Sequence, residues 1–298
     1  MGVLDGRSVV VTGAGQGLGR AFARHAAAAG AAVVVNDIDA ETAVKTAESI
    51  DDAGGRAVAD VGDVSDAVYA SSLVERCVSA FGGIDGLVNN AAVNYHVEPW
   101  EDDDAARTRT LVETNVLGPL YCGAAALKHM VARRSGAIVN LTSGSMIGQR
   151  GAAAYSASKG AVASLTYSWA ADVAGHGVRV NAVCPIAWTR MMRESRDARL
   201  HGNPALTPDL VAPLVTYLLS DLSAALNGQV LRLAGGHLHV VRQPAVKPPV
   251  PHRDVWEVED IADAVAGELA TALEPPPPER WFLGGFTASG DQSTVERT

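Results

Sequence analysis

The chain has 298 residues, of which 48% are hydrophobic, and a formal net charge of −9. This acidic balance argues against a nucleic-acid partner, because phosphate binding needs a basic face. No apolar run approaches the ~20 residues that are needed to span a membrane. A strand pattern begins within the first ten residues, so we do not expect a signal peptide there. Three scattered cysteines, Cys77, Cys122 and Cys184, fit neither a disulfide framework nor a metal site. We therefore expect a cytoplasmic protein that binds no metal, membrane or nucleic acid.

Short apolar runs rich in β-branched residues alternate with longer alanine-rich segments of helical period. The predicted strands are Ser8–Thr12, Ala32–Asn36, Ala57–Asp60, Gly86–Asn89, Ala137–Leu141, Val178–Val183 and Gln229–Leu233. The predicted helices lie near 17–29, 40–52, 66–80, 105–131, 153–174 and 208–220. Continuously apolar strands are typical of a parallel sheet covered on both faces, and the alternation favours right-handed crossovers. The pattern predicts an α/β fold with a doubly wound, seven-stranded parallel sheet in residues 1–240.

The character of the chain changes after about residue 240. The proline-rich stretch 243–251 cannot continue a sheet or a helix, and a helical pattern follows at about Val258–Leu273. A second proline run, Pro275–Pro278, and an apolar patch at 281–283 come next, before a polar end that we expect to be disordered. We predict that residues 241–298 form a C-terminal extension with one helix, and that part of it docks on a surface such as a neighbouring subunit.

A glycine-rich turn joins the first strand to the first helix. Its glycines follow the spacing Gly-x-x-x-Gly-x-Gly in Thr12–Gly19. Backbone amides at a helix N-terminus form an anion site, and glycine lets a dinucleotide pyrophosphate approach closely. A turn without a ligand is the alternative, but the strand–turn–helix context favours cofactor binding. The predicted cofactor-binding residues of this turn are Gly13, Gln16, Gly17, Leu18 and Gly19.

The second strand ends at Asp37, and the third is followed by Asp63 and Val64. A carboxylate at Asp37 can accept from the adenosine ribose hydroxyls and would repel a 2′-phosphate. Neither Gln16 nor Ile38 is an arginine that could offset that repulsion, so we predict NAD rather than NADP. Asp63 and Val64 could hold the adenine through a carboxylate and a neighbouring amide, with a helix N-cap as the alternative.

Tyr155 and Lys159 stand four residues apart in a segment of helical pattern. This spacing places the two side chains on one face of a helix. A phenol has a pKa of about 10, and a nearby ammonium lowers it by favouring the phenolate. The pair therefore predicts a tyrosine that exchanges a proton at physiological pH, although the same spacing also arises as an ordinary surface pair.

Taken together, these motifs resemble those of the short-chain dehydrogenase/reductase family. The resemblance spans residues 5–238 and depends on Thr12–Gly19, Asn89–Ala92, Asn115, Ser143, Tyr155, Lys159 and Pro185–Thr189. It implies a Rossmann fold, a nicotinamide cofactor and hydride transfer at an alcohol or ketone. It also implies a homotetramer or homodimer, formed through the helices near 105–131 and 153–174.

The resemblance assigns catalytic roles to four residues. Tyr155 would be the general acid/base, and Lys159 would lower its pKa and bind the nicotinamide ribose. Ser143 would hydrogen-bond the substrate oxygen, and Asn115 would hold a water in a proton relay to Lys159. The hydroxyls of Ser143 and Tyr155 would stabilise the alkoxide that reduction forms and oxidation starts from.

The resemblance also assigns further cofactor contacts to Asn89 and Ala91, to Pro185 and Ile186, and to Thr189, which would hold the nicotinamide carboxamide.

The sequence departs from the family pattern in two places. Ser143 stands 12 residues before Tyr155. The family serine commonly stands one residue further away, where this chain has Thr142; Thr142 and Ser145 are therefore lesser candidates for the catalytic hydroxyl. An isoleucine, Ile186, follows Pro185 where the family usually has glycine, which makes both contacts less secure.

The segment 187–204 occupies the place of the family's substrate lid. Its arginines, Arg190, Arg193, Arg196 and Arg199, alternate with Glu194 and Asp197 and drift around a helix, which favours a solvated, self-paired surface. The sharper hypothesis is that these arginines bind coenzyme A phosphates, since the chain also resembles the hydroxyacyl-CoA dehydrogenase part of multifunctional β-oxidation enzymes.

We predict an NAD-dependent oxidoreductase that interconverts a secondary alcohol and a ketone, with a 3-hydroxyacyl-CoA or a steroid-like compound as candidate substrates. The alternatives are an NADPH-dependent 3-oxoacyl reductase and a non-catalytic nucleotide-binding regulator.

Overall fold

The structure, a computed structural model, describes residues 2–194 and 203–274. The chain divides into two compact units, Met1–Val241 and Arg242–Thr298. The first unit is an α/β sandwich built on one sheet with the strand order β3-β2-β1-β4-β5-β6-β7-β8. No helix in the described residues is long and apolar enough to cross a membrane.

The sheet is parallel except at one edge. Its strands are β1 (Ser8–Val11), β2 (Ala32–Asp37), β3 (Arg56–Val61), β4 (Gly86–Asn89), β5 (Gly136–Leu141), β6 (Val178–Ile186), β7 (Val230–Ala234) and β8 (His237–Val240). The prediction of seven parallel strands was therefore one strand short, because β8 adds to β7 in the antiparallel direction. Gly235, with φ of +57°, permits the two-residue turn between them. The alternating His-Leu-His-Val sequence of β8 is the signal of an edge strand.

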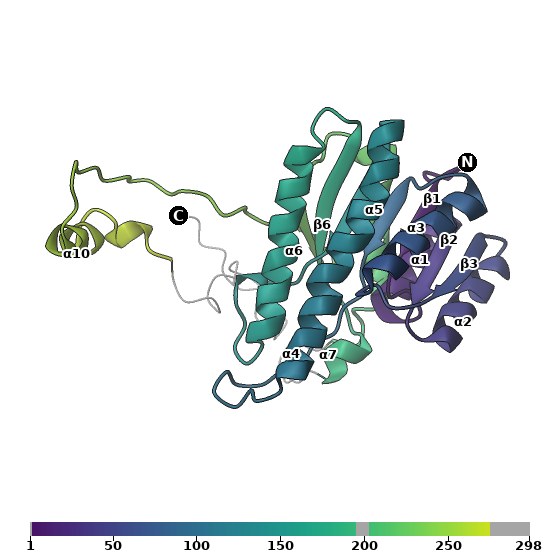
Figure 1. Cartoon of the computed structure of the whole chain (residues 1–298), viewed down its shortest axis with the longest axis horizontal. Helices are drawn as coiled ribbons and strands as arrows, with labels where there is room; N and C mark the ends of the chain where they lie inside the picture. Colours follow the sequence, from purple (N-terminus) through teal and green to yellow (C-terminus); the bar gives the residue numbers. More distant parts are fainter. Residues whose placement is uncertain (1, 195–202, 275–298) are drawn as a thin grey trace. The chain divides into compact units, whose positions relative to one another are not determined.

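Helices cover both faces of the sheet (Figure 1). The face that carries the first core cluster is covered by α1 (Gly17–Ala28), α2 (Ala40–Asp51) and α9 (Ala212–Leu219). The other face is covered by α3 (Ala67–Phe81), α5 (Gly118–Arg133) and α6 (Ala153–Asp172). The shorter elements of this unit are α4 (Ala105–Val112), α7 (Arg190–Glu194), the π-helix η1 (Glu113–Leu117) and the 3₁₀ turns η2 (Gly144–Ile147), η3 (Pro208–Leu210) and η4 (Asp221–Ser223).

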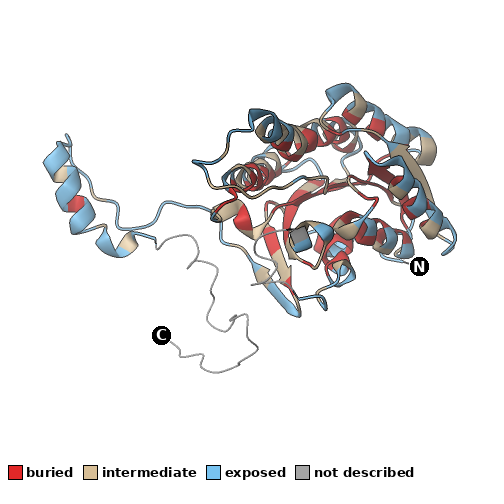
Figure 2. Ribbon diagram, turned by 90° about the horizontal axis from the view of Figure 1, so that it is seen from below, coloured by how far each residue is buried: buried red, intermediate tan, exposed pale blue. Residues whose placement is uncertain are grey.

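The central strands are buried on both faces, as their unbroken apolar sequences predict. Every residue of β1, β2 and β4 is buried, and Figure 2 shows the buried strands between more exposed helices. Burying one valine side chain contributes roughly 1.5–3 kcal/mol, so this layer dominates the core. Because parallel strands end at the same edge, the residues that follow β1, β2, β4, β5 and β6 meet there, which is where doubly wound sheets bind ligands.

The helix predicted over 105–131 is divided in the structure into α4, η1 and α5. Pro119, at the start of α5, has no N–H to continue the hydrogen-bond ladder of the preceding turn. A π-helical turn, in which Gly118 N donates to Glu113 O, connects the two helices. Asn115 lies at the centre of this turn.

In the second unit, the helix predicted over Val258–Leu273 is shorter. It consists of α10 (Val258–Ala266) followed by the 3₁₀ turn η5 (Ala270–Ala272). A capping box formed by Glu257 and Asp260 starts α10. The predictions for Pro275–Pro278, the apolar patch at 281–283 and the disordered end lie outside the described residues.

Candidate active site

The glycine turn has a shape that side chains would fill. Gly13 and Gly17 adopt φ of +60° and +55°. A Cβ on Gly13 would stand 2.8 Å from Ala91 Cα, and one on Gly19 would stand 2.1 Å from Gly13 O. Gln16 is the N-cap of α1 but makes no side-chain cap hydrogen bond, so it does not satisfy the first N–H groups of the helix. Leu18 packs against the core, which leaves its backbone to face a ligand. These features fit the pyrophosphate of a dinucleotide.

Asn90 holds this turn, a role that the sequence analysis did not assign. Its Nδ2 donates to Thr12 O and Gly13 O, each at 2.9 Å. The Thr12 hydroxyl accepts from the backbone N–H groups of Asn90 at 3.0 Å and Ala91 at 3.1 Å. Asn89 differs, because its buried side chain donates to Asn140 Oδ1 at 2.9 Å, inside the core. Only the backbone of Asn89 is therefore left to line the predicted cofactor path.

The Asp37 carboxylate is buried at the end of β2 and is held by backbone donors. Its Oδ2 accepts from Gly15 N at 2.8 Å and its Oδ1 accepts from Asp39 N at 3.1 Å. An ionised carboxylate has about four acceptor sites, so two remain for a pair of ribose hydroxyls. Ile38 beside it is largely exposed and offers no cation to a 2′-phosphate.

Asp63 and Val64 follow β3 at the same edge of the sheet. The exposed Asp63 carboxylate accepts from Ser65 N at 2.9 Å, whereas Val64 is buried. The N-cap of α3 is Asp66, which accepts from the first-turn N–H groups of that helix. Asp66, and not Asp63, is therefore the residue that caps α3. The Asp63 side chain lies at the surface.

Tyr155 and Lys159 lie together in the first two turns of α6 and are both buried. Lys159 Nζ is 5.7 Å from the centre of the Tyr155 ring and donates to Leu141 O, at the end of β5, at 2.8 Å. The ring also packs in a small apolar cluster with Leu111 and Ala152. The positions of the Tyr155 ring and the Lys159 ammonium are thus fixed by α6 and by the end of β5.

Burial dominates the electrostatics of this pair. It raises the pKa of Tyr155 to about 12, and a hydrogen bond from the Ser143 hydroxyl partly opposes the change. It lowers the pKa of Lys159 to about 8, because a charged ammonium is disfavoured away from water. In this structure the loss of solvent has the largest effect on the pKa of the phenol.

Three residues with hydroxyl groups follow β5, and each hydroxyl has a different hydrogen-bond partner. Thr142 Oγ1 donates to Val183 O of β6 at 3.1 Å, inside the sheet. Ser145 Oγ donates to Gln149 Oε1. Ser143 Oγ accepts from Ser145 N and donates to Ser145 Oγ, each at 3.2 Å, and Ser143 is the one of the three that lowers the pKa of the Tyr155 phenol.

Asn115 is fully buried and connects the π-helical turn to the loop after β4. Its Oδ1 accepts from Val93 N at 2.8 Å, and its Nδ2 donates to Val93 O at 2.9 Å and to Ser158 Oγ at 3.1 Å. Ser158 Oγ in turn donates to Tyr155 O at 2.8 Å. Because Pro119 has no N–H, the backbone carbonyl of Asn115 lacks the donor that an α-helix supplies. The side chain is thus structural, and the carbonyl is the group suited to hold a water.

The end of β6 brings the remaining predicted residues to the glycine turn. Pro185 and Ile186 are partly buried and pair with Leu233 and Ala234 of β7. The Thr189 methyl group lies 3.7 Å from the Cβ position of Gly17, which places Thr189 beside the start of α1.

The lid arginines are only partly described. Arg190 and Arg193 are exposed on α7, as a solvated helix face would be. Arg196 and Arg199 lie outside the described residues. Within the described residues, no group of three or more His, Cys, Asp and Glu side chains is placed to hold a metal ion.

The geometry agrees with comparisons to known proteins. A family model described as short chain dehydrogenase matches residues 7–200. The chain belongs to the short-chain dehydrogenase/reductase family. It is 39% identical over 243 residues to the cis-4-hydroxycyclohexanecarboxylate dehydrogenase of Sinomonas cyclohexanicum, covering 78% of this chain and 97% of that protein. It is 36% identical to the meso-2,3-butanediol dehydrogenase of Serratia marcescens, covering 81% and 98%.

Among solved structures, the chain is similar to a short chain dehydrogenase from Mycobacterium avium, with 32% identity and a TM-score of 0.82. That match covers 93% of this chain and 99% of the other. As a member of the short-chain dehydrogenases, the protein is an oxidoreductase that acts on CH–OH groups and uses a nicotinamide cofactor.

Proposed function

We propose that this short-chain dehydrogenase uses NAD to interconvert a secondary alcohol and a ketone. The observation that carries the proposal is that Tyr155 and Lys159 are buried side by side, with Lys159 Nζ 5.7 Å from the centre of the phenol ring, and that the Ser143 hydroxyl acts on the phenol by lowering its pKa. These groups stand at the sheet edge to which the glycine turn and Asp37 also belong. A bound nicotinamide would supply the hydride acceptor or donor.

The proton chemistry follows from the protein's own residues. In reduction, the Tyr155 hydroxyl donates its proton to the forming alkoxide while Ser143 donates a hydrogen bond to the same oxygen. In oxidation, the Tyr155 phenolate accepts the proton of the alcohol and becomes the neutral phenol. Lys159, whose pKa is lowered to about 8, can exchange a proton near neutral pH and so connect the buried site with a water at the Asn115 carbonyl.

NAD is favoured over NADP by the setting of Asp37. Gly15 N and Asp39 N hold its carboxylate in place, so it cannot swing away from a 2′-phosphate. Repulsion between two anions at close range is strong where water is partly excluded. The main alternative, an NADPH-dependent 3-oxoacyl reductase, requires this carboxylate to tolerate that phosphate.

The substrate class is proposed from the names of the relatives. Their names describe a hydroxylated cyclohexanecarboxylate and butanediol, which are small secondary alcohols. A 3-hydroxyacyl-CoA stays a second candidate because Arg190 and Arg193 are exposed at the position of the lid. Steroid-like alcohols are the third.

The test is a panel of these alcohols and their ketones, each assayed with NAD and with NADP by the absorbance of the reduced cofactor. We expect turnover with NAD and loss of at least ~10²-fold of it in Tyr155→Phe, with binding of NAD retained. Activity that survives Tyr155→Phe would overturn the mechanism. A wild type that binds NAD but turns over no alcohol or ketone would favour the non-catalytic regulator.

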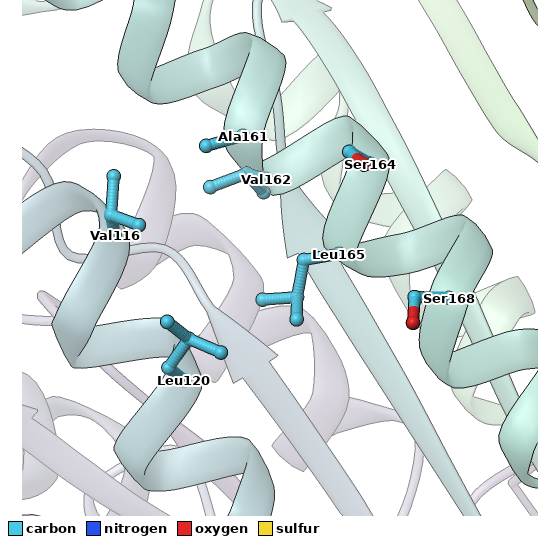
Figure 3. A pocket seen from close by; sticks show the side chains of 7 residues that line it. All are labelled: Val116, Leu120, Ala161, Val162, Ser164, Leu165 and Ser168. Carbon is cyan, nitrogen blue, oxygen red and sulfur yellow. The ribbon is translucent and has the colours of Figure 1, made fainter.

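We further propose that the protein is a homodimer or homotetramer. An apolar groove of about 290 Å³ lies between the helical segment that carries Val116 and Leu120 and the middle of α6. The side chains that line it are drawn in Figure 3. Leu165 of α6 lines it from the opposite side. Leu165→Asp should shift the mass measured by light scattering toward the monomer, and an unchanged mass would exclude this face.

Residues 241–298 are proposed as an extension rather than a second catalytic domain. The two relatives are matched over 97% and 98% of their own length, yet these matches cover only 78% and 81% of this chain. The catalytic groups described above all precede residue 241. A variant ending at Val241 that keeps its turnover per site would support this division.

We also propose a reducing compartment such as the cytoplasm. Cys77, Cys122 and Cys184 are free thiols and are all buried. Burial raises the pKa of Cys77 and of Cys122 to about 12, which keeps both thiols protonated and unreactive.

A further inference from the structure

A network of polar side chains connects the end of β2 to the end of β3, and a tyrosine of α3 stands at its centre. Asn36 is buried, and its Nδ2 donates to the Tyr69 hydroxyl at 3.0 Å and to Gly62 O at 3.2 Å. The Tyr69 hydroxyl in turn donates to Asp60 Oδ1. Burial, together with this hydrogen bond, raises the pKa of Tyr69, so the hydroxyl stays protonated and remains the donor.

The network lies at the edge of the sheet. The strand order ends at β3, whose neighbour is β2 (Figure 1). The residues of β3 are partly buried or exposed, whereas every residue of β2 is buried. Asn36 and Asp60 are partners in the strand register, so their side chains lie on one face of the sheet, toward α3. The network therefore holds the end of the edge strand against its neighbour.

Asp37 follows Asn36 on β2, and its side chain points to the opposite face, where its carboxylate accepts from Gly15 N of the glycine turn at 2.8 Å. Its backbone carbonyl accepts from Gly62 N at 3.1 Å. Gly62 O is the same atom that accepts from Asn36 Nδ2. Both backbone groups of Gly62 are thus bound to the end of β2, and the network on one face supports the backbone that carries Asp37 on the other.

The Tyr69 ring also occupies the space that a side chain at Gly62 would need. A Cβ on Gly62 would stand 2.2 Å from Tyr69 Cε2. Tyr69 lies in the first turn of α3, where its backbone N–H donates to the N-cap carboxylate of Asp66 at 3.2 Å. The start of α3 therefore holds the ring beside Gly62, while the hydroxyl reaches side chains of both strands.

We propose that Tyr69 is a positioning residue of the cofactor site, which holds the ends of β2 and β3 together so that the Asp37 carboxylate meets the adenosine ribose hydroxyls. The inference rests on the proposed use of NAD and deepens it. A preformed site binds more tightly than one that must be ordered on binding, so loosening this network should weaken the binding of the cofactor. The proton-transferring pair, Tyr155 and Lys159, lies on α6, so kcat should not depend on Tyr69.

The first experiment is Tyr69→Phe, which keeps the ring and removes the hydroxyl. We expect the KM for NAD to rise roughly 3- to 10-fold, about the worth of one hydrogen bond, with kcat at saturating NAD within about 2-fold of the wild type. The inhibition constant of AMP, which carries only the adenosine half of the cofactor, should rise by the same factor. Asp60→Asn keeps an acceptor but loses the charge, so its effect should be smaller. Tyr121→Phe, at a partly buried tyrosine of the same core cluster, is the matched control and should change neither constant.

The decisive measurement is a double-mutant cycle with Asp37→Ala. If Tyr69 acts through the Asp37 carboxylate, Tyr69→Phe has no group left to position in that background, and the KM for NAD should change by less than about 2-fold. The same rise in the Asp37→Ala background as in the wild type would overturn the inference. A lower melting temperature of Tyr69→Phe with an unchanged KM for NAD would overturn it as well, because it would show that the network only stabilises the fold.

Either result leaves the proposed function standing if Asp37→Ala alone raises the KM for NAD. A wild type that turns over no secondary alcohol or ketone with NAD would overturn the proposed function and the inference together. Should Tyr69→Phe not fold, Asp60→Asn takes its place in the same cycle, where its smaller effect on the KM for NAD should likewise vanish in the Asp37→Ala background.

Discussion

The cofactor side and the catalytic side of the site hold their groups in different ways. At the glycine turn, most hydrogen bonds involve the backbone: Asp37 accepts from Gly15 N and Asp39 N, and Asn90 donates to Thr12 O and Gly13 O. At Tyr155, the phenol ring and Lys159 are buried side by side on α6, and burial sets their pKa values. On the cofactor side, backbone hydrogen bonds fix the shape of the binding turn. On the catalytic side, burial sets the protonation of Tyr155 and Lys159. Substitutions should therefore change binding on the first side and proton transfer on the second.

Removing the hydroxyl of Ser143 tests the catalytic side most severely. Ser143→Ala should lower kcat roughly 10²- to 10³-fold, because one donor to the developing alkoxide is lost, while the KM for NAD stays close to that of the wild type. The matched control is Thr142→Val, since Thr142 Oγ1 donates to Val183 O inside the sheet. That variant should cost about 1 kcal/mol of stability and leave kcat nearly unchanged. A larger loss of kcat in Thr142→Val than in Ser143→Ala would reverse the assignment.

The pH dependence of the free energy of unfolding tests whether burial lowers the pKa of Lys159. Its pKa is about 8 in the folded protein and 10.5 as the ordinary value. Between these values the unfolded chain binds a proton that the folded protein does not, so the free energy of unfolding should rise with pH across this window. The rise should be on the order of 3 kcal/mol over the whole window, and Lys159→Met should lack it.

The measurement is urea unfolding of the cofactor-free wild type and of Lys159→Met from pH 7 to pH 10. Tyr155 acts in the opposite direction above that range, since its raised pKa makes stability fall as pH rises from 10 to about 12. Parallel curves for the two proteins below pH 10 would show that Lys159 is not desolvated.

On the cofactor side, Asp37→Ala should exchange cofactor preference rather than abolish activity. The KM for NAD should rise about 10- to 100-fold with the loss of charge-assisted hydrogen bonds to the ribose, and the KM for NADP should fall. Ile38→Arg in the same background should lower the KM for NADP further, because an arginine there can pair with the 2′-phosphate. Steady-state kinetics with both cofactors give the answer. If the wild type already prefers NADP, the role assigned to Asp37 is wrong.

The difference between the two sides also explains what the sequence could predict. The glycine turn and Asp37 lie within local strand–turn–helix signals, so their arrangement could be inferred from spacing. The pKa of Tyr155 could not, because its direction depends on how deeply α6 buries the ring. The strand β8 and the pairing of Asn36 with Asp60 depend on register between strands, which spacing along the chain does not determine. The family resemblance left both Ser143 and Thr142 as candidates for the catalytic hydroxyl, and the hydrogen bond of Thr142 inside the sheet favours Ser143.

Asn90 offers the mildest test, and it concerns a residue that spacing alone did not single out. Asn90→Ala leaves Thr12 O and Gly13 O without their amide donor and should loosen the glycine turn, at a cost of about 1–2 kcal/mol. Because the turn shapes the cofactor site, the KM for NAD should rise about 3- to 10-fold while kcat at saturating NAD changes little. Asn94→Ala, in the loop that follows, serves as the control and should leave the KM for NAD unchanged. A fall in kcat with an unchanged KM in Asn90→Ala would mean that the turn also governs the geometry around Tyr155, and the separation of the two sides would not hold.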